Sequence, residues 1–181
     1  RMKAEVLKEL PPKTENIYRI ELEEEQRKLY LAAVLDAREK LKAAKPEDKM
    51  AVFAVLMRLR EICCDPHLIA DNWEGGSAKL DACTELVTSA VEGGHRILLF
   101  SQFTSMLDLL AKRLDEAGIS HFTLQGSTPK PVRAELVRRF NGGEVSVFLI
   151  SLRAGGTGLN LTAADIVIHY DPWWNVAAQN Q

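Results

Sequence analysis

The sequence has few of the features that mark a secreted, membrane or disordered protein. Its three cysteines, two of them adjacent, are too few for a disulfide framework and favour a reducing interior. No apolar run is long enough to cross a bilayer, and no signal-peptide pattern opens the chain, so we expect no membrane partner. The 23 basic and 25 acidic side chains nearly balance, which excludes a charged disordered tail and a strongly basic nucleic-acid binder. Any nucleic acid must therefore be bound through a local patch.

Several catalytic motifs are missing as well. The sequence holds no Gly-x-x-x-x-Gly-Lys-Ser/Thr phosphate loop and no paired-acid motif for a catalytic Mg²⁺. Cys63, Cys64 and His67 make too small a ligand set for a metal site, so a core role is favoured. Gly156 and Gly158 lack the third glycine of a dinucleotide loop. We therefore expect that this chain alone cannot hydrolyse a nucleotide by the usual route.

The 181 residues, 46% of them hydrophobic, suffice for one domain with an appendage. Residues 1–22 read as a proline-stiffened connector, with an alternating apolar pattern that predicts a first strand over 14–22. Residues 23–72 carry two apolar helical faces separated by Pro46, which predicts a helical hairpin. Residues 73–181 alternate short apolar runs with helical patterns. The last part therefore predicts an α/β domain.

In that α/β part we expect a parallel sheet with helices on both of its faces. Unbroken apolar runs are typical of strands that are buried on both faces. Ser77 and Thr128 stand where they can cap helices. The expected strands cover residues 97–100, 121–124, 147–150 and 166–168.

Polar or glycine-rich residues follow each of the four expected strands. The carboxyl ends of parallel strands form one edge of a sheet, and ligands bind at that edge. Turn chemistry accounts for any one of these clusters, but all four together favour a binding site. The clusters are Ser101–Gln102, Gln125–Thr128, Ser151–Asn160 and His169–Asn175.

These loops are suited to binding an anion. A helix opened by the residues Gly126, Ser127 and Thr128 would offer backbone N–H groups and hydroxyls to a phosphate. Arg153 can bind a phosphate through two hydrogen bonds. Trp174 can stack on a sugar, although a half-buried structural tryptophan explains it equally well.

With these motifs in place, the sequence resembles the second RecA-like lobe of the Swi/Snf family of helicase-like ATPases, most closely the bacterial members. The expected hairpin corresponds to an insertion in that lobe. The matching blocks are Leu10–Lys13, Leu59–Pro66, Leu98–Thr104, Gly126–Thr128, Phe140–Asn141, Phe148–Thr162 and Asp171–Asn175.

The resemblance implies an ATP-driven motor that moves along double-stranded DNA without separating the strands. ATP and Mg²⁺ would be bound mainly by an N-terminal ATPase lobe of the same protein, so this lobe would be inactive alone. By position, the DNA-binding residues would be Ser101, Gln102, Gly126, Ser127, Thr128, Arg153 and Trp174. The nucleotide-binding residues would be Gly156, Gly158, Asn160 and Gln181.

The sequence departs from the family pattern at three places. Gln125 stands at a position where the family frequently has aspartate. Val176 stands at the position after Trp-Asn, where the family usually has proline. Gln181 begins a motif whose two arginines reach ATP in the family, and neither arginine is present here. In related nucleotide hydrolases such arginines contribute about 10³–10⁵ in rate.

The resemblance leaves the biological task open, since the motor could act on a nucleoprotein or on a polymerase. A bacterial protein of this kind would be cytoplasmic and associated with the nucleoid, and a eukaryotic one nuclear. The alternative hypothesis is a non-catalytic module that uses the RecA-like scaffold and the hairpin to bind protein. Phosphate-binding residues on the sheet edge favour the motor, because a protein-binding scaffold does not need them.

Overall fold

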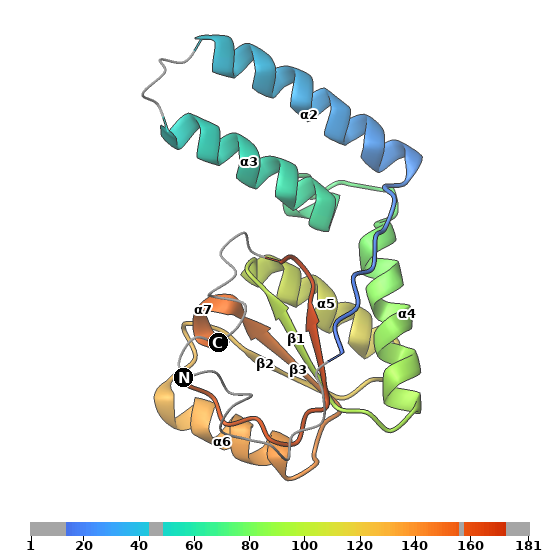
Figure 1. Cartoon of the computed structure of the whole chain (residues 1–181), viewed down its shortest axis with the longest axis vertical. Helices are drawn as coiled ribbons and strands as arrows, with labels where there is room; N and C mark the ends of the chain where they lie inside the picture. The colour runs from blue at the N-terminus through green and yellow to red at the C-terminus, as the bar shows by residue number, and fades with distance from the viewer. Residues whose placement is uncertain (1–13, 44–48, 156–157, 173–181) are drawn as a thin grey trace.

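A computed structural model describes residues 14–43, 49–155 and 158–172 (Figure 1). The expected connector at 10–13 and the expected site residues Gly156, Trp174 and Gln181 lie outside these ranges. Within them, no helix combines the length and the apolar character needed to span a membrane.

The sheet is parallel throughout, as expected. It contains β1 (Ile97–Ser101), β2 (His121–Leu124), β3 (Val147–Ser151) and β4 (Ile166–His169), in the order β2-β3-β1-β4. Three of the strands end one residue later than the apolar pattern indicates, because their backbone pairing continues into the first polar residue.

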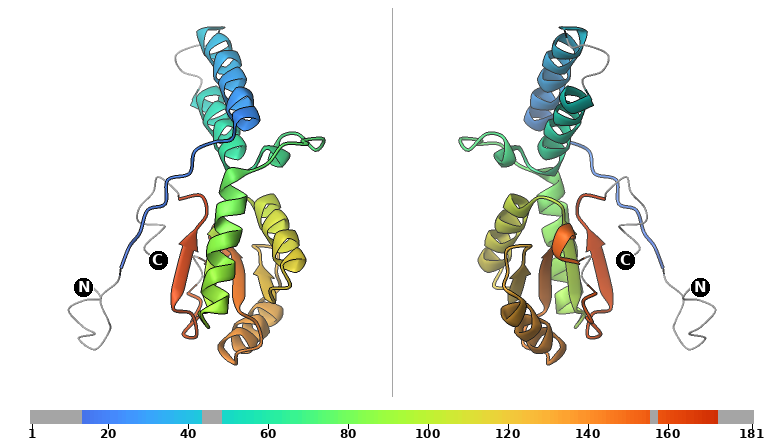
Figure 2. Two further views of the ribbon diagram at one scale, coloured as in Figure 1. Left: turned by 90° about the vertical axis from the view of Figure 1, so that its right-hand side faces the viewer. Right: turned by 90° about the vertical axis from the view of Figure 1, so that its left-hand side faces the viewer.

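Helices cover both faces of the sheet, which confirms the expected architecture (Figure 2). On one face, α4 (Ala78–Glu92) and α5 (Thr104–Glu116) pack against the β1 residues Ile97 and Leu99. On the other face, α6 (Lys130–Asn141) and the short α7 (Leu152–Gly155) pack against Leu98 and Phe148. Since successive strand residues point to opposite faces, the unbroken apolar runs supply both cores.

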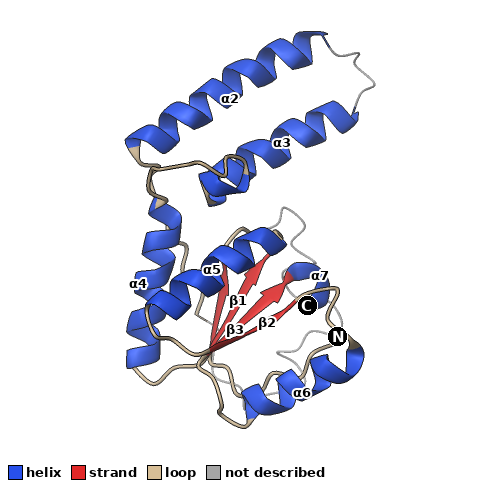
Figure 3. Cartoon of the chain, turned by 180° about the vertical axis from the view of Figure 1, so that it is seen from behind, coloured by secondary structure: helices blue, strands red, loops and turns tan. Residues whose placement is uncertain are grey.

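The helical hairpin consists of α2 (Glu24–Ala43) and α3 (Lys49–Cys64), followed by the 3₁₀ turn η1 (Pro66–Leu68). The hairpin projects beyond the end of the sheet toward which the strands point, above the start of α4 (Figure 3). Gln26 of α2 is fully buried, and its side-chain amide donates to the carbonyl of Ile62 at 2.8 Å. This bond satisfies one of the carbonyls left open at the end of α3.

Two local expectations were wrong, and a third, for Ser77, was confirmed in position only. Residues 14–22 form no strand, and Ile17 is 83% exposed, because an alternating pattern makes a strand only where a neighbouring strand pairs with it. Ser77 occupies the N-cap position of α4, but its hydroxyl donates instead to the carbonyl of Cys64 at 3.3 Å. Pro129, and not Thr128, is the N-cap residue of α6.

Two of the three cysteines are core residues, while Cys63, expected in the core, is only half-buried. Cys64 and Cys83 are buried, and burial raises the pKa of each thiol to about 12. Both thiols therefore stay protonated at neutral pH. Among the described residues, no group of three or more histidine, cysteine or acidic side chains is arranged to hold a metal ion.

Gly155 at the end of α7 lies too close to Phe100 to tolerate a side chain. A Cβ atom there would lie 2.7 Å from Cε1 of the Phe100 ring, which stacks on His169. We expect Gly155→Ala to lower the free energy of unfolding by about 1–3 kcal/mol, the usual cost of overpacking. Gly126→Ala is the matched control, because a Cβ atom at Gly126 would meet nothing within 4 Å. Urea unfolding of both variants tests this, and equal losses would contradict it.

A histidine–carboxylate pair joins two loops at the amino end of the sheet. Asp165 Oδ2 lies 2.6 Å from His95 Nδ1, and Asp165 Oδ1 accepts from the Arg96 N–H at 2.9 Å. The pKa of Asp165 is lowered from its ordinary value of 3.8, and the largest cause is the hydrogen bond with His95. The ionised carboxylate therefore stabilises the fold above about pH 4, and this contribution is lost as the pH falls through the lowered pKa.

We expect His95→Ala to raise the pKa of Asp165 toward the ordinary value. An NMR titration of the Asp165 side-chain carboxyl carbon measures the change directly. Identical titration midpoints in the variant and the parent would show that His95 does not lower this pKa.

Candidate nucleic-acid interface

The strand register brings the starts of the four polar clusters to one edge. Ser101 pairs with Ser151 across β1 and β3, and Leu124 of β2 is level with Ile150 of β3. On the other side of β1, Phe100 is level with His169, the last residue of β4. Since all four strands are parallel, the segments that follow them start at the same edge. The hairpin overhangs this edge (Figure 1).

A buried carboxylate lies at the end of β4. Asp171 is 4% exposed, and its two side-chain oxygens accept from the Gln102 N–H at 3.0 and 3.3 Å. Burial raises the pKa of Asp171, while a hydrogen bond with the Ser101 hydroxyl opposes this shift. The carboxylate thus fixes the backbone immediately after β1.

Ser101, expected to contact DNA, is a fully buried residue. Its hydroxyl accepts from the Phe103 N–H at 3.2 Å and bonds with Asp171. Burial leaves this hydroxyl no surface for a phosphate, because the serine ends a strand that is covered on both faces. The structure places Ser101 as a support for the turn that holds Gln102.

Gln102 presents an unused amide at the edge. Its side-chain oxygen and nitrogen are both buried, and neither has a hydrogen-bond partner among the described residues. A buried amide without a partner costs about 1–3 kcal/mol. Gln102 can therefore bond with an outside group only when its side chain turns outward from this buried position.

The turn between β2 and α6 is open to solvent. Gly126 and Ser127 are exposed, while the Thr128 hydroxyl accepts from the Gln125 N–H at 3.1 Å. The side chain of Thr128 thus closes the turn and does not cap α6. The exposed backbone and the Ser127 hydroxyl remain accessible to a ligand.

Arg153 lies in α7, directly after β3, and is exposed. In the described ranges, no carboxylate or carbonyl is bonded to its guanidinium. The short helix beneath it is held through both backbone groups of Ala154. Ser151 Oγ accepts from the Ala154 N–H at 3.3 Å, and Arg133 Nη1 donates to the Ala154 carbonyl at 3.4 Å. Among the described residues, Arg153 is thus a cation without a carboxylate partner, on a fixed support.

The loop before β4 holds the other described residues expected at the site. Gly158 has a φ of +65°, a conformation that favours glycine, and both Gly158 and Asn160 are exposed. Asn141 at the end of α6 donates to the Asn160 carbonyl at 2.8 Å and accepts from the Ala163 N–H at 3.3 Å. Asn141 therefore fixes this loop against α6.

Sequence reasoning gave no role to two residues of the site. Arg60 of α3 donates to the carbonyls of Asp171 and Pro172, at 3.5 and 3.2 Å. The Tyr170 hydroxyl donates to the Cys64 carbonyl at 2.8 Å, and burial raises its pKa. Both contacts join segments more than 100 residues apart in the sequence. Locally, Arg60 is one of three charged residues in the second half of α3, with Arg58 and Glu61, and nothing in that pattern singles it out.

Comparison with known protein families adds to this geometry. Residues 78–181 match the family described as the helicase conserved C-terminal domain, and residues 1–68 match the SNF2-related domain. An uncharacterized ATP-dependent helicase of Mycoplasma genitalium is 36% identical over 186 residues, covering 100% of this chain and 18% of the relative. The human SWI/SNF-related regulator of chromatin subfamily A member 1 is also 36% identical, over 97% of this chain and 18% of its own length.

Solved structures agree with these matches. The Sulfolobus solfataricus SWI2/SNF2 ATPase C-terminal domain superposes with a TM-score of 0.78 at 29% identity, covering 88% of this chain and 72% of that one. The ATPase core from the same organism in complex with double-stranded DNA superposes with a TM-score of 0.77 at 26% identity. That match covers 86% of this chain and 34% of the core.

The parallel sheet and its polar carboxyl edge define a RecA-like lobe of the helicase type. The chain belongs to the helicase conserved C-terminal domain family, and within it to the Swi/Snf group of ATP-dependent helicases and remodellers. It spans 18% of the length of the curated relatives just described.

Proposed function

We propose that this chain is the second motor lobe of an ATP-dependent translocase that moves on double-stranded DNA. The observation that carries the proposal is Arg153, a guanidinium at the carboxyl edge of the sheet that is exposed and has no carboxylate partner among the described residues. A guanidinium is suited to a phosphate because it offers two parallel hydrogen bonds. The DNA-bound Sulfolobus core supports double-stranded DNA as the ligand.

The other DNA contacts are proposed around Arg153. Gln102 would use its unpartnered amide, and Gly126 and Ser127 would use the backbone and hydroxyl of their exposed turn. Ser101 and Thr128 would act indirectly, by holding the two turns. Trp174 completes the proposed set from outside the described residues.

The chemistry of these groups fits a motor rather than a sequence-specific DNA-binding protein. Guanidinium, amide, hydroxyl and backbone N–H groups all bond with phosphate oxygens, which are the same at every step along DNA. Phosphate contacts fix the position of a protein on the duplex and carry no sequence information directly. A translocase must bind every sequence that it crosses, so this set suits it.

We propose ATP and Mg²⁺ as cofactors of the intact protein, bound mainly by an N-terminal lobe. The curated name of the Mycoplasma relative, an ATP-dependent helicase, supports the use of ATP. From this chain, Gly158 and Asn160 belong to the proposed nucleotide-binding set, and both are exposed in the loop between α7 and β4. Gly156 and Gln181 belong to the same proposed set and lie outside the described residues.

The proposed partners are double-stranded DNA and the N-terminal ATPase lobe of the same protein. A nucleoprotein or a polymerase would be the object that the motor acts on. In a bacterial cell the protein would be associated with the nucleoid, and in a eukaryotic cell it would be nuclear.

Displacement of a third strand from a DNA triplex tests the proposed function. The intact protein is expected to release a triplex-forming oligonucleotide when ATP is present, while the two strands of the underlying duplex stay paired. Non-hydrolysable ATP is the control and should release nothing. Separation of the duplex strands, or release that does not need ATP, would contradict translocation without unwinding.

A further inference from the structure

The joint between the helical hairpin and the lobe contains a polar connection to the proposed DNA site. Arg60 of α3 lies near Asp171, with Nη2 3.9 Å from Oδ2, and bonds with the carbonyls of Asp171 and Pro172. Asp171 in turn binds the Gln102 N–H. Three elements far apart in the sequence thus meet at one buried carboxylate.

The packing around this connection is open. A groove lined by Tyr30, Leu56 and Leu59 of the hairpin and by Lys79 of α4 separates α3 from the lobe. The side chain of Arg60 lines this groove and is only 20% exposed. The end of α3 is also held by the Tyr170 hydroxyl, which donates to the Cys64 carbonyl, so hydrogen bonds with fixed directions help to set the position of α3 above the site.

We propose that Arg60 and Asp171 are positioning residues that couple the helical hairpin to Gln102. This inference rests on the proposed function, because Gln102 is one of the proposed DNA contacts. A shift of α3 moves the Arg60 guanidinium, which pulls on the segment that carries Asp171. Asp171 then moves the Gln102 backbone, and with it the unpartnered amide. A partner that moves the hairpin would thereby change the affinity of the lobe for DNA.

The first test is hydrogen exchange in the intact protein without DNA or ATP. Arg60→Ala should speed exchange of the amides of Gln102 and Phe103 about 3- to 10-fold, in line with the coupling measured between contacting residues. Exchange in the sheet core, at Leu99 for example, should stay unchanged. Exchange that is unaffected at Gln102, or that rises equally throughout β1, would overturn the coupling.

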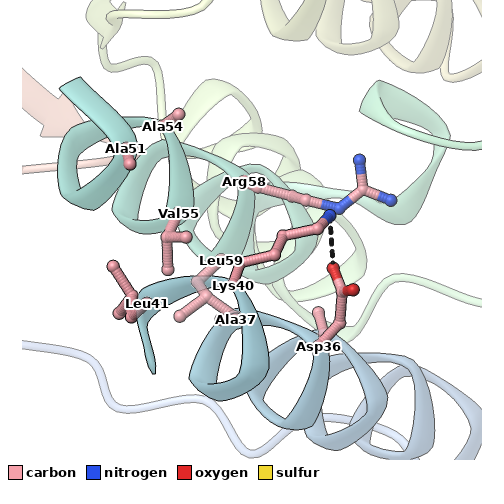
Figure 4. Close-up of a pocket in the computed structure, with 10 residues that line it drawn as sticks. Asp36, Ala37, Lys40, Leu41, Ala51, Ala54, Val55, Arg58 and Leu59 are labelled. Atoms are coloured by element: carbon pink, nitrogen blue, oxygen red, sulfur yellow. Dashed lines mark ion pairs between the residues drawn. The ribbon is translucent and has the colours of Figure 1, made fainter. Parts of the chain in front are cut away.

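Arg58→Ala is the matched control, because Arg58 lies on the same helix and points away from the joint. Figure 4 shows Arg58 beside Lys40, whose amine forms an ion pair with Asp36 at 2.7 Å. This variant should leave exchange at Gln102 at the parent rate. If Arg58→Ala and Arg60→Ala act alike, the effect belongs to α3 in general, and the specific connection is wrong.

A second measurement separates positioning from direct DNA contact. Arg60→Ala should raise the DNA concentration that half-saturates binding about 3- to 10-fold and leave the salt dependence of binding unchanged. A reduced salt dependence would show that Arg60 itself binds phosphate and would overturn its positioning role. If the parent protein does not bind DNA, the proposed function is refuted. The coupling is still tested, because the exchange experiment is done without DNA.

Discussion

Replacing Arg153 with alanine in the intact protein is expected to weaken its binding to duplex DNA about tenfold. Hydrogen bonds to charged groups contribute about 1.5–3 kcal/mol, and an exposed site lies at the lower end of that range. The loss should be similar on every DNA sequence, and the slope of log affinity against log salt should fall by about one unit. Fluorescence anisotropy at several salt concentrations measures both quantities.

Arg138→Ala is the control for charge alone. Arg138 is an exposed arginine of α6, but its guanidinium is paired with Glu135, with Nη2 2.6 Å from Oε1. We expect this variant to bind DNA like the parent. The proposed role of Arg153 would be contradicted if Arg153→Ala lost affinity for one DNA sequence only, or if the two variants lost the same affinity.

Phe148→Ala is expected to have the largest effect on stability. Phe148 is fully buried in β3, and its ring lies 5.3 Å from that of Phe140 and 6.1 Å from that of Phe122. Removing a buried phenylalanine costs about 3–5 kcal/mol, because the lost transfer energy is accompanied by a cavity. Urea unfolding followed by circular dichroism measures the loss.

Val132→Ala on α6 is the matched control, because Val132 is 47% exposed. Its free energy of unfolding should stay within about 0.5 kcal/mol of the parent value. A loss below about 1 kcal/mol for Phe148→Ala would show that the face of the sheet covered by α6 is not closely packed.

The α/β fold could be predicted because its signals are local. Each strand is a short apolar run bounded by glycine or polar residues, so its position follows from the pattern alone. The strand predicted over 14–22 was wrong for the opposite reason. An alternating pattern describes a strand only when another strand pairs with it, and pairing is a property of the whole fold.

The position of the candidate site could be predicted from the topology, but the burial and the hydrogen bonds of its side chains could not. Parallel strands bring Gln102, Ser127 and Arg153 to one edge, as the sequence indicated. The Ser101 hydroxyl and the Gln102 N–H both bond with Asp171, which lies 69 residues from Gln102. The contact of Arg60 with Asp171 spans 111 residues. No local pattern reports contacts at such separations.

The ATPase rate of the intact protein, with and without double-stranded DNA, tests the proposed motor most directly. Duplex DNA should stimulate hydrolysis strongly in the parent, and Arg153→Ala should need a higher DNA concentration to reach half of that stimulation. An ATPase rate that does not respond to DNA would contradict the motor. It would favour instead a protein-binding module that uses the exposed apolar residues of the hairpin, among them Leu35 and Phe53.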